Sequence, residues 1–276
     1  MRGAIGRAAL PFLALLGACN EQPAGKAVTR IDLENPDKVA TAAPSPAPSP
    51  TIASACEATA FEDARLTHCV ADPAKHRITT MLGNPPYRGF KAFAETSPDE
   101  ARRVVFGMNA GMFDGEGKPI GYYVKDGERL KELNRNDGAG NFHMKPNGVF
   151  FGGGGKWRVM TSDDFYAQVG DRPEFGTQSG PMLVVDGKLH PEITDDGPSR
   201  TIRNGVGVDS AGRAHFVISE GPVSFGKIAR YFRDVLKTPN ALYLDGGVSS
   251  LWDPASGRVD SRTPLGPLLL VEDKSQ

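Results

Sequence analysis

Short apolar runs that end at glycine constrain the fold of this chain more than any other feature. Residues 149–151 and 157–160 flank four consecutive glycines, a pattern typical of a β-hairpin with a Gly-rich tip. No helix start and no Lys-Ser/Thr pair follows these glycines, which argues against a phosphate-binding loop. With 33 Gly and 22 Pro in 276 residues, the sequence favours many strands and turns over long helical bundles.

The remaining pattern predicts one α+β domain with a mixed or largely antiparallel sheet and a few helices. A short helix is predicted to begin at Ser97-Pro98, with Ser97 as its cap, and a longer one at 224–236. The longer helix would present Ile228, Phe232, Val235 and Leu236 on one apolar face. Strands are predicted at 77–82, 104–106 ending at Gly107, 122–124, 182–185 and 241–244, with a second hairpin at 205–219.

The first residues are typical of an export signal. Arg2 and Arg7 precede an apolar run that is too short to span a bilayer as a mature helix. Leu16-Gly17-Ala18-Cys19 is similar to the bacterial lipobox, in which the cysteine is lipidated after cleavage. We therefore predict a signal peptide at 1–18 and a lipid on Cys19; the alternative is a plain signal with an incidental cysteine. This predicts an exported bacterial lipoprotein in the periplasm-facing envelope, at the outer membrane.

Residues 19–55 are predicted to form a lipidated, disordered tether. Their Pro/Ala/Ser-rich stretch at 42–50 lacks the apolar period needed to form a core. The folded domain is then 56–276. With Cys19 assigned to the lipid, Cys56 and Cys69 remain as an even pair in an exported protein, which predicts a disulfide.

Charge and histidine spacing bear on the partners of the protein. The formal net charge of −1 argues against a nucleic-acid binder. The five histidines are scattered and form no strong metal motif, so no metal site is predicted. No cofactor is predicted, and a divalent metal is left open. Membrane contact is predicted through the Cys19 lipid only.

Polar residues and glycines gather where the predicted strands end. Strand ends hold side chains rigidly at the edge of a cleft, and Asp245-Gly246-Gly247, after a buried strand, places an acid beside main chain that a ligand can approach closely. Taken singly, each segment also fits a turn or a cap. The four segments are 109–114, 140–148, 177–181 with 200–205, and 244–250.

Six motifs within these segments resemble the phosphodiester glycosidase family, the domain of the mannose 6-phosphate uncovering enzyme and its bacterial relatives. They come in the family's order, and the resemblance covers about residues 60–272. The motifs are Asn109-Ala110-Gly111-Met112-Phe113, Gly140-Asn141-Phe142-His143, Lys145-Pro146-Asn147-Gly148-Val149-Phe150, Thr177-Gln178-Ser179-Gly180-Pro181, Arg203-Asn204-Gly205-Val206-Gly207 and Leu244-Asp245-Gly246-Gly247-Val248-Ser249-Ser250.

The resemblance implies hydrolysis of a sugar-1-phosphodiester at the anomeric carbon. A phosphate monoester leaves readily because its second pKa is about 6, so strong acid assistance is less necessary than for an ordinary glycoside. The reaction still needs a carboxylate, for which Asp245 is the first candidate and Glu220 the second. It also needs a cation for the phosphate, for which the planar fork of Arg203 is preferred over Lys145.

Further residues of the motifs are candidates for orienting sugar hydroxyls or phosphate oxygens. They are Asn109, Asn147, Gln178, Ser179, Gly246, Gly247 and Ser249. Asp114 and His143 are candidate acids or bases for which a structural role is weighed equally. The partner expected is a sugar phosphate or an envelope glycan. The alternative function is a non-catalytic module that binds an envelope glycan or polymer on the same fold.

Overall fold

The computed structural model describes residues 29–31, 39–41, 53–170 and 172–275. The chain divides into two compact units, Met1–Pro50 and Thr51–Gln276. In the first unit, β1 (Thr29–Ile31) pairs antiparallel with β2 (Val39–Thr41). The predicted signal peptide, Cys19 and the other parts of the predicted tether before residue 53 lie outside the described residues. Among the described residues, none of the helices has the length and apolar character that crossing a membrane requires.

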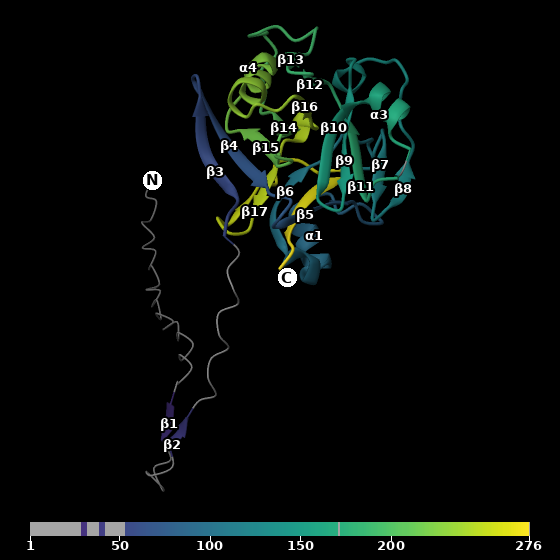
Figure 1. The fold of residues 1–276 in the computed structure, drawn as a ribbon. Coiled ribbons are helices and arrows are strands. Elements are labelled where there is room, and N and C mark those ends of the chain that lie inside the picture. The colour runs from purple at the N-terminus through teal and green to yellow at the C-terminus, as the bar shows by residue number, and fades with distance from the viewer. Residues whose placement is uncertain (1–28, 32–38, 42–52, 171, 276) are drawn as a thin grey trace, which may run out of the picture. The chain divides into compact units, whose positions relative to one another are not determined.

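The second unit is an α+β domain of three antiparallel sheets, which confirms the predicted fold class. The largest sheet has seven strands in the order β13-β12-β16-β14-β15-β4-β3 (Figure 1). Their bounds are β3 (Cys56–Phe61), β4 (Ala64–Ala71), β12 (Met182–Val185), β13 (Lys188–Leu189), β14 (Asn204–Val208), β15 (Ala214–Ser219) and β16 (Asn240–Tyr243).

Two five-stranded sheets complete the domain, in the orders β10-β9-β11-β7-β8 and β18-β17-β6-β19-β5. The first is made of β7 (Tyr123–Lys125), β8 (Glu128–Lys131), β9 (Gly148–Gly153), β10 (Lys156–Thr161) and β11 (Phe175–Ser179). The second is made of β5 (His76–Met81), β6 (Val104–Asn109), β17 (Leu251–Asp253), β18 (Arg258–Val259) and β19 (Leu268–Asp273).

The helical segments are short. They are α1 (Phe90–Thr96), α2 (Pro98–Ala101), the 3-10 turn η1 (Asn141–His143), α3 (Ser162–Gln168), α4 (Phe225–Arg230), the π turn η2 (Tyr231–Val235) and the 3-10 turn η3 (Gly246–Val248). α2 confirms the predicted helix after Ser97. The predicted cap is wrong, because the Ser97 side chain makes no capping bond and its hydroxyl lies 3.3 Å from the Tyr87 hydroxyl instead.

The hairpins turn where the sequence places Asp-Gly and Gly-Gly. Asp126 and Gly127 have φ of 50° and 75°, and Asp186 and Gly187 have φ of 47° and 75°. Two successive positive φ angles are the geometry of the tight turn whose twist matches that of the flanking strands. The Gly-rich tip between β9 and β10 uses the same geometry, which confirms the predicted hairpin.

One core lies where the three sheets meet. The Phe216 ring from the seven-stranded sheet lies 5.2 Å from Phe106 of β6 and 5.8 Å from Phe150 of β9. Phe150 in turn lies 5.2 Å from Phe175 of β11. All four side chains are at most 1% exposed. Burial of each such ring contributes about 2 kcal/mol, so these contacts hold the three sheets against one another.

β6 extends further than predicted. The sequence predicts a strand ending at Gly107, but the strand continues to Asn109 with every residue buried. A Cβ at Gly107 would lie 2.8 Å from the Phe90 ring and 3.0 Å from Leu270. Glycine is therefore present here for close packing of α1 against the sheet, and it does not end the strand. The extension matters because it brings Asn109 to the edge of the sheet.

α4 and η2 cover the other face of the seven-stranded sheet. Ser224 caps α4 by accepting a hydrogen bond from the Lys227 amide, and Ile228 and Phe232 are buried as predicted. Val235 was predicted on the same face but is 50% exposed. The π turn explains the difference: it widens the helix after Arg230, so the 3.6-residue period no longer places Val235 against the sheet. Lys227, predicted outside the apolar face, is 7% exposed and reaches Asp63.

The β3–β4 hairpin forms a long arm along one side of the domain (Figure 1). Cys56 and Cys69 lie opposite each other across this pair and form a disulfide, with their Cα atoms 3.9 Å apart. The predicted disulfide is confirmed. It joins the first residue of the edge strand β3 to β4, whose other neighbour in the sheet is β15.

Candidate active site

The polar segments predicted at strand ends lie side by side in the structure. The Asp245 amide donates to the Ala110 carbonyl at 3.2 Å, which joins the chain after β16 to the chain after β6. The Gly111 amide donates to the Thr177 hydroxyl at 3.0 Å, which adds the middle of β11. The Leu244 amide donates to the Asn204 carbonyl at 3.1 Å, which adds the start of β14. Segments separated by more than 100 residues thus form one polar edge.

Two buried asparagines hold the main chain at Asp245. Asn109 Nδ2 donates to the Asp245 carbonyl at 2.8 Å, and its Oδ1 accepts from Asn204 Nδ2 at 2.9 Å. The same Oδ1 accepts from the Ser250 amide at 2.9 Å. Ser249 Oγ lies 3.0 Å from Asn204 Oδ1. Because Asn109 and Asn204 are at most 1% exposed, these bonds lie inside the protein and fix the segment that carries the carboxylate.

The Asp245 carboxylate has no cationic partner among the described residues. Its Oδ1 accepts one hydrogen bond, from the Gly247 amide at 3.1 Å. Burial raises the pKa of Asp245, and the Gly247 hydrogen bond only partly opposes this. A Cβ at Gly247 would meet only Asp245 Oδ1, at 3.3 Å, so space is open beside the carboxylate. A partly desolvated carboxylate facing open space is suited to accepting a proton or attacking a carbon atom.

Arg203 points into the protein. It is 1% exposed, and its Nε donates to the Val223 carbonyl at 2.9 Å. Its Nη1 donates to the Tyr243 hydroxyl at 3.1 Å, and its Nη2 donates to the Ser199 carbonyl at 3.0 Å. The guanidinium also lies 3.5 Å from the centre of the Phe225 ring. Every guanidinium nitrogen is therefore engaged by protein, and the guanidinium is enclosed, whereas phosphate binding would need an open fork.

Two further predicted residues, Gln178 and Asn147, support loops around the edge, and a third, Ser179, is enclosed without a hydrogen bond from its side chain. Gln178 Oε1 accepts from the Tyr122 and Asn134 amides, each at 2.9 Å, and its Nε2 donates to the Asn134 carbonyl at 2.7 Å. Asn147 Nδ2 donates to the Phe142 carbonyl at 2.8 Å. Ser179 is fully buried, and its hydroxyl has no hydrogen-bond partner among the described residues. Gln178 and Asn147 thus shape the loops beside the site.

The other predicted residues form separate contacts. Glu220 Oε1 accepts from Thr67 Oγ1 at 2.6 Å and Arg258 Nη1 at 2.7 Å, so its charge is already paired. Lys145 Nζ donates to Asp137 Oδ1 at 2.5 Å.

Two candidate acids or bases have local partners. Asp114 Oδ1 accepts from the Glu116 and Lys118 amides within its own turn, each at 3.0 Å. His143 Nδ1 lies 3.1 Å from the Asn136 carbonyl. Of the candidate acids and bases, Asp245 is therefore the one joined directly to the Asn109–Asn204 cluster.

A family model of phosphodiester glycosidases matches residues 102–266, which span Asn109, Asn204 and Asp245. The chain belongs to the phosphodiester glycosidase family. The chain is also similar to the uncharacterized protein YigE of Escherichia coli (strain K12), with 34% identity over 172 residues, which are 62% of this chain and 67% of that protein.

Solved structures share the fold. The catalytic domain of zebrafish N-acetylglucosamine-1-phosphodiester alpha-N-acetylglucosaminidase, auto-inhibited by its pro-peptide, superposes with a TM-score of 0.56 at 16% identity, over 82% of this chain and 85% of that one. A hypothetical protein from Synechocystis superposes with a TM-score of 0.51 at 15% identity, over 79% of this chain and 61% of that one. At these identities the likeness establishes the fold alone.

Two residues of this family member were not among the predicted site residues. Asn204 lies inside the motif 203–207, of which Arg203 is the predicted site residue. The sequence pattern predicts Tyr243 as an apolar residue of the strand at 241–244, and alternation along an extended chain would place its side chain on the same side as that of Asp245, two positions later. That alternation was the signal available in the sequence for Tyr243.

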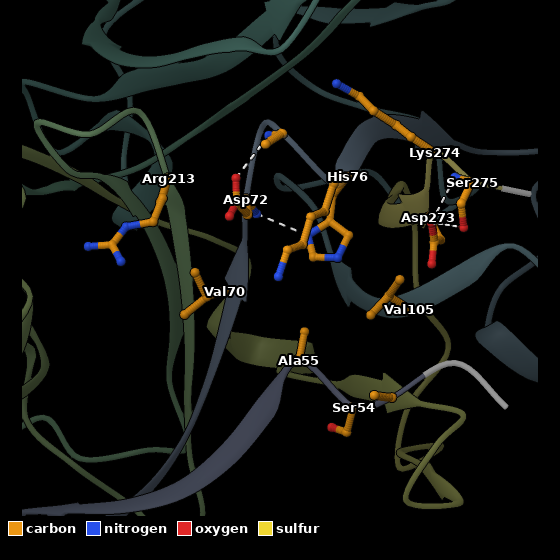
Figure 2. Close-up of a pocket in the computed structure, with 13 residues that line it drawn as sticks. Ser54, Ala55, Val70, Asp72, His76, Val105, Arg213, Asp273, Lys274 and Ser275 are labelled. Atoms are coloured by element: carbon orange, nitrogen blue, oxygen red, sulfur yellow. Dashed lines mark hydrogen bonds between the residues drawn. The ribbon is translucent and has the colours of Figure 1, made fainter.

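A separate cleft of about 830 Å³ lies between the start of the domain and its C-terminal strand (Figure 2). Its polar groups bond locally: His76 Nδ1 accepts from the Asp72 amide at 3.0 Å, and Lys274 Nζ donates to the Pro73 carbonyl at 2.6 Å. None of the predicted site residues lines it. Among the described residues, no three His, Cys, Asp or Glu side chains gather closely enough to hold a metal ion.

Proposed function

We propose that the domain hydrolyses a sugar-1-phosphodiester at the anomeric carbon, with Asp245 as the reacting carboxylate. Membership in the family supports a glycosidase-type hydrolase. The observation that carries the proposal is the Asp245 carboxylate itself, which has no cationic partner among the described residues and is held at a fixed edge with open space beside Gly247. A carboxylate in this state is chemically available, unlike Glu220, which Arg258 already engages.

In the proposed reaction, a water oxygen forms a bond to the anomeric carbon while Asp245 takes a proton from that water. The bond between the anomeric carbon and the phosphate oxygen breaks, and the phosphate monoester leaves with the bonding electrons. A phosphate with a second pKa of about 6 needs little protonation to leave. Direct attack by Asp245 on the anomeric carbon, followed by hydrolysis of the glycosyl ester, gives the same phosphate monoester and the same sugar with the opposite anomeric configuration.

In this proposal, most of the remaining predicted residues hold the Asp245 segment and the neighbouring loops in place. Asn109 and Ser249 keep the Asp245 segment in place, and Gly246-Gly247 lets the substrate approach the main chain. Gln178 and Asn147 hold the loops beside the site. Lys145 lies on the loop at 140–148 and is a candidate for phosphate contact if it leaves Asp137. For the enclosed Arg203, a direct phosphate contact would need rearrangement of its protein partners.

We also propose that the protein is an exported lipoprotein held in the bacterial envelope through Cys19. The support is the lipobox-like Leu16-Gly17-Ala18-Cys19 and the Pro-rich stretch that follows. A substrate would then be an envelope glycan or a sugar phosphate reachable from that tether.

Incubation of the purified full-length protein with a panel of sugar-1-phosphodiesters and nucleotide-sugars tests the function. Release of free sugar together with an intact phosphate monoester is the expected result. If no member of a broad panel is cleaved while envelope polysaccharide binds, the domain is a glycan-binding module and the hydrolase proposal fails.

A further inference from the structure

Tyr243 lies directly beneath the turn that carries the Asp245 carboxylate. It is the last residue of β16 and is 1% exposed. A Cβ at Gly246 would lie 1.7 Å from the Tyr243 hydroxyl oxygen and 2.3 Å from the ring carbon that bears it. The phenol end therefore touches the main chain of Asp245-Gly246-Gly247, and only glycine fits at position 246 without displacing it.

Arg203 and Phe225 keep the Tyr243 phenol in one place. Arg203 Nη1 donates to the hydroxyl at 3.1 Å, and the Phe225 ring packs edge-on against the Tyr243 ring at 4.7 Å. Arg203 is itself fixed by the carbonyls of Val223 and Ser199. These partners come from the chain before α4 and from the loop that precedes β14. The hydroxyl is thus held by groups that are themselves fixed by the surrounding chain.

Asn204, the first residue of β14, and Arg203, which directly precedes it and whose carbonyl accepts from the Ser219 amide at 2.9 Å, connect to opposite sides of the Asp245 turn. Successive side chains of a strand point to opposite faces of the sheet. Asn204 bonds to Asn109, whose amide holds the Asp245 carbonyl, while Arg203 bonds to Tyr243 beneath Gly246. The dipeptide Arg203-Asn204 therefore holds the turn at 245–247 from two sides. This accounts for a buried arginine next to the site whose guanidinium is enclosed by protein.

We propose that Tyr243, held by Arg203, is a positioning residue for Asp245. Tyr243 fixes the position and orientation of the Asp245-Gly246-Gly247 turn, so the Asp245 carboxylate can react with the substrate without a prior rearrangement of the turn. This inference rests on the proposed function. Catalytic groups need placement within about 0.5 Å, and a displacement of about 1 Å can cost about 100-fold in rate. The hydroxyl is the part of Tyr243 that makes the contact, so its removal is the direct perturbation.

The test is Tyr243→Phe, which removes the hydroxyl oxygen and leaves the ring. We expect kcat to fall about 10- to 100-fold while KM changes by less than about twofold, because positioning acts on the reaction and not on substrate binding. The acid limb of the pH profile should move to lower pH, since a looser turn admits water and relieves the burial that raises the pKa of Asp245.

Tyr231→Phe is the matched control. Tyr231 is also buried, at 3% exposed, but its ring packs against Phe61 of the β3–β4 arm. The control removes the same hydroxyl group and keeps the ring, and it should leave kcat and the acid limb unchanged. Equal kinetic losses in the two variants would mean that Tyr243 acts only through stability, which overturns the proposal.

A double-mutant cycle with Arg203→Lys tests the coupling, including the case in which Tyr243→Phe folds poorly. Lysine keeps the charge and loses the fork, so kcat should fall by a smaller factor. In the double variant the two losses should not multiply, because both act through one contact. Fully multiplied losses would show that Arg203 and Tyr243 act separately.

A second readout separates this inference from the proposed function. Carbon-13 NMR titration of the Asp245 carboxylate needs no substrate, and the Asp245→Asn variant assigns its signal. We expect a lower Asp245 pKa in Tyr243→Phe than in the wild type and no change in Tyr231→Phe. If the wild type hydrolyses nothing but this difference is found, the proposed function fails and the positioning stands. If the Asp245 pKa is the same in all three proteins, the positioning inference is wrong.

Discussion

The buried histidine pair of the β-sheet predicts how the stability of the domain depends on pH. His68 of β4 and His215 of β15 are 7% and 5% exposed, and His68 Nε2 lies 2.9 Å from His215 Nδ1. His215 Nε2 lies 3.0 Å from Asp209 Oδ2. Burial alone would raise the pKa of Asp209, but hydrogen bonds from His215 and Arg213 outweigh it and lower that pKa to about 2. Asp209 is therefore ionised and accepts from His215, whose Nδ1 then accepts from a neutral His68.

Protonation of the neutral His68 imidazole is unfavourable in the folded state. Burial, followed by the charge of His215, lowers the pKa of His68 from 6.5 to about 4, although Glu57 at 3.6 Å opposes the shift. The unfolded chain binds this proton as pH falls through about 6.5, and the folded chain binds it only near pH 4. Each pKa unit corresponds to about 1.4 kcal/mol, so His68 should remove about 2.5 kcal/mol of stability between pH 7.5 and 4.5.

Urea denaturation of the wild type and of His68→Gln at pH 7.5 and 4.5, followed by tryptophan fluorescence, isolates this contribution. Glutamine can still donate to His215 Nδ1 but does not titrate. Burial also lowers the pKa values of His76, His190 and His215, so both proteins should lose stability on acidification. The wild type should lose about 2.5 kcal/mol more than the variant. His143→Gln, in the 3-10 turn η1 outside the seven-stranded sheet, serves as the control. Equal losses in the wild type and His68→Gln would refute the reasoning.

Three further predictions concern the arm, the tether and the anchor. Replacing Cys56 and Cys69 with serine should lower the free energy of unfolding by about 3 kcal/mol, as read from urea denaturation without reductant, because the closed loop restricts the unfolded chain. Deleting residues 20–50 should leave the melting temperature of the domain within about 2 °C of the full-length value, since this Pro-rich segment lacks apolar residues to bury; a fall of many degrees would show that the segment belongs to the fold. Cys19→Ser should abolish metabolic labelling with a radioactive fatty acid and release the protein from the membrane fraction, and labelling that persists would exclude this cysteine as the lipid site.

The fold could be predicted where turn-forming residues decide the local structure. Glycine and Asp-Gly mark the ends of β9, β10 and β12, so those strands and their turns follow from the sequence. Gly107 shows the limit of this rule, because a glycine kept for packing against Phe90 has the same appearance as one that ends a strand. The exposure of Val235 depends on a π turn that a 3.6-residue period does not reveal. The arrangement of three sheets depends on long-range pairings, such as β5 with β19, which local patterns do not encode.

In the candidate site too, local patterns predict some features, and others depend on how the strands pair. Polar residues after strands indicated the segments that meet, and Asn109, Ser249 and Asp245 do lie together. The direction of Arg203 could not be predicted, because the motif Arg203-Asn204-Gly205 does not tell which of two adjacent side chains faces the site. The register of β14 between β15 and β16 decides this, and it is a property of the assembled sheet. Tyr243 was missed since a buried aromatic at a strand end looks like core.

The most direct test of the proposed function is the rate of sugar release by Asp245→Asn on a sugar-1-phosphodiester that the wild type cleaves. The change is nearly isosteric, and an asparagine oxygen can still accept from the Gly247 amide, so the urea midpoint should stay close to the wild-type value. We predict a loss of at least about 100-fold in kcat, because the variant cannot accept the proton of the attacking water or form the glycosyl ester. Cleavage at the wild-type rate would contradict the account and make Glu220 the candidate carboxylate.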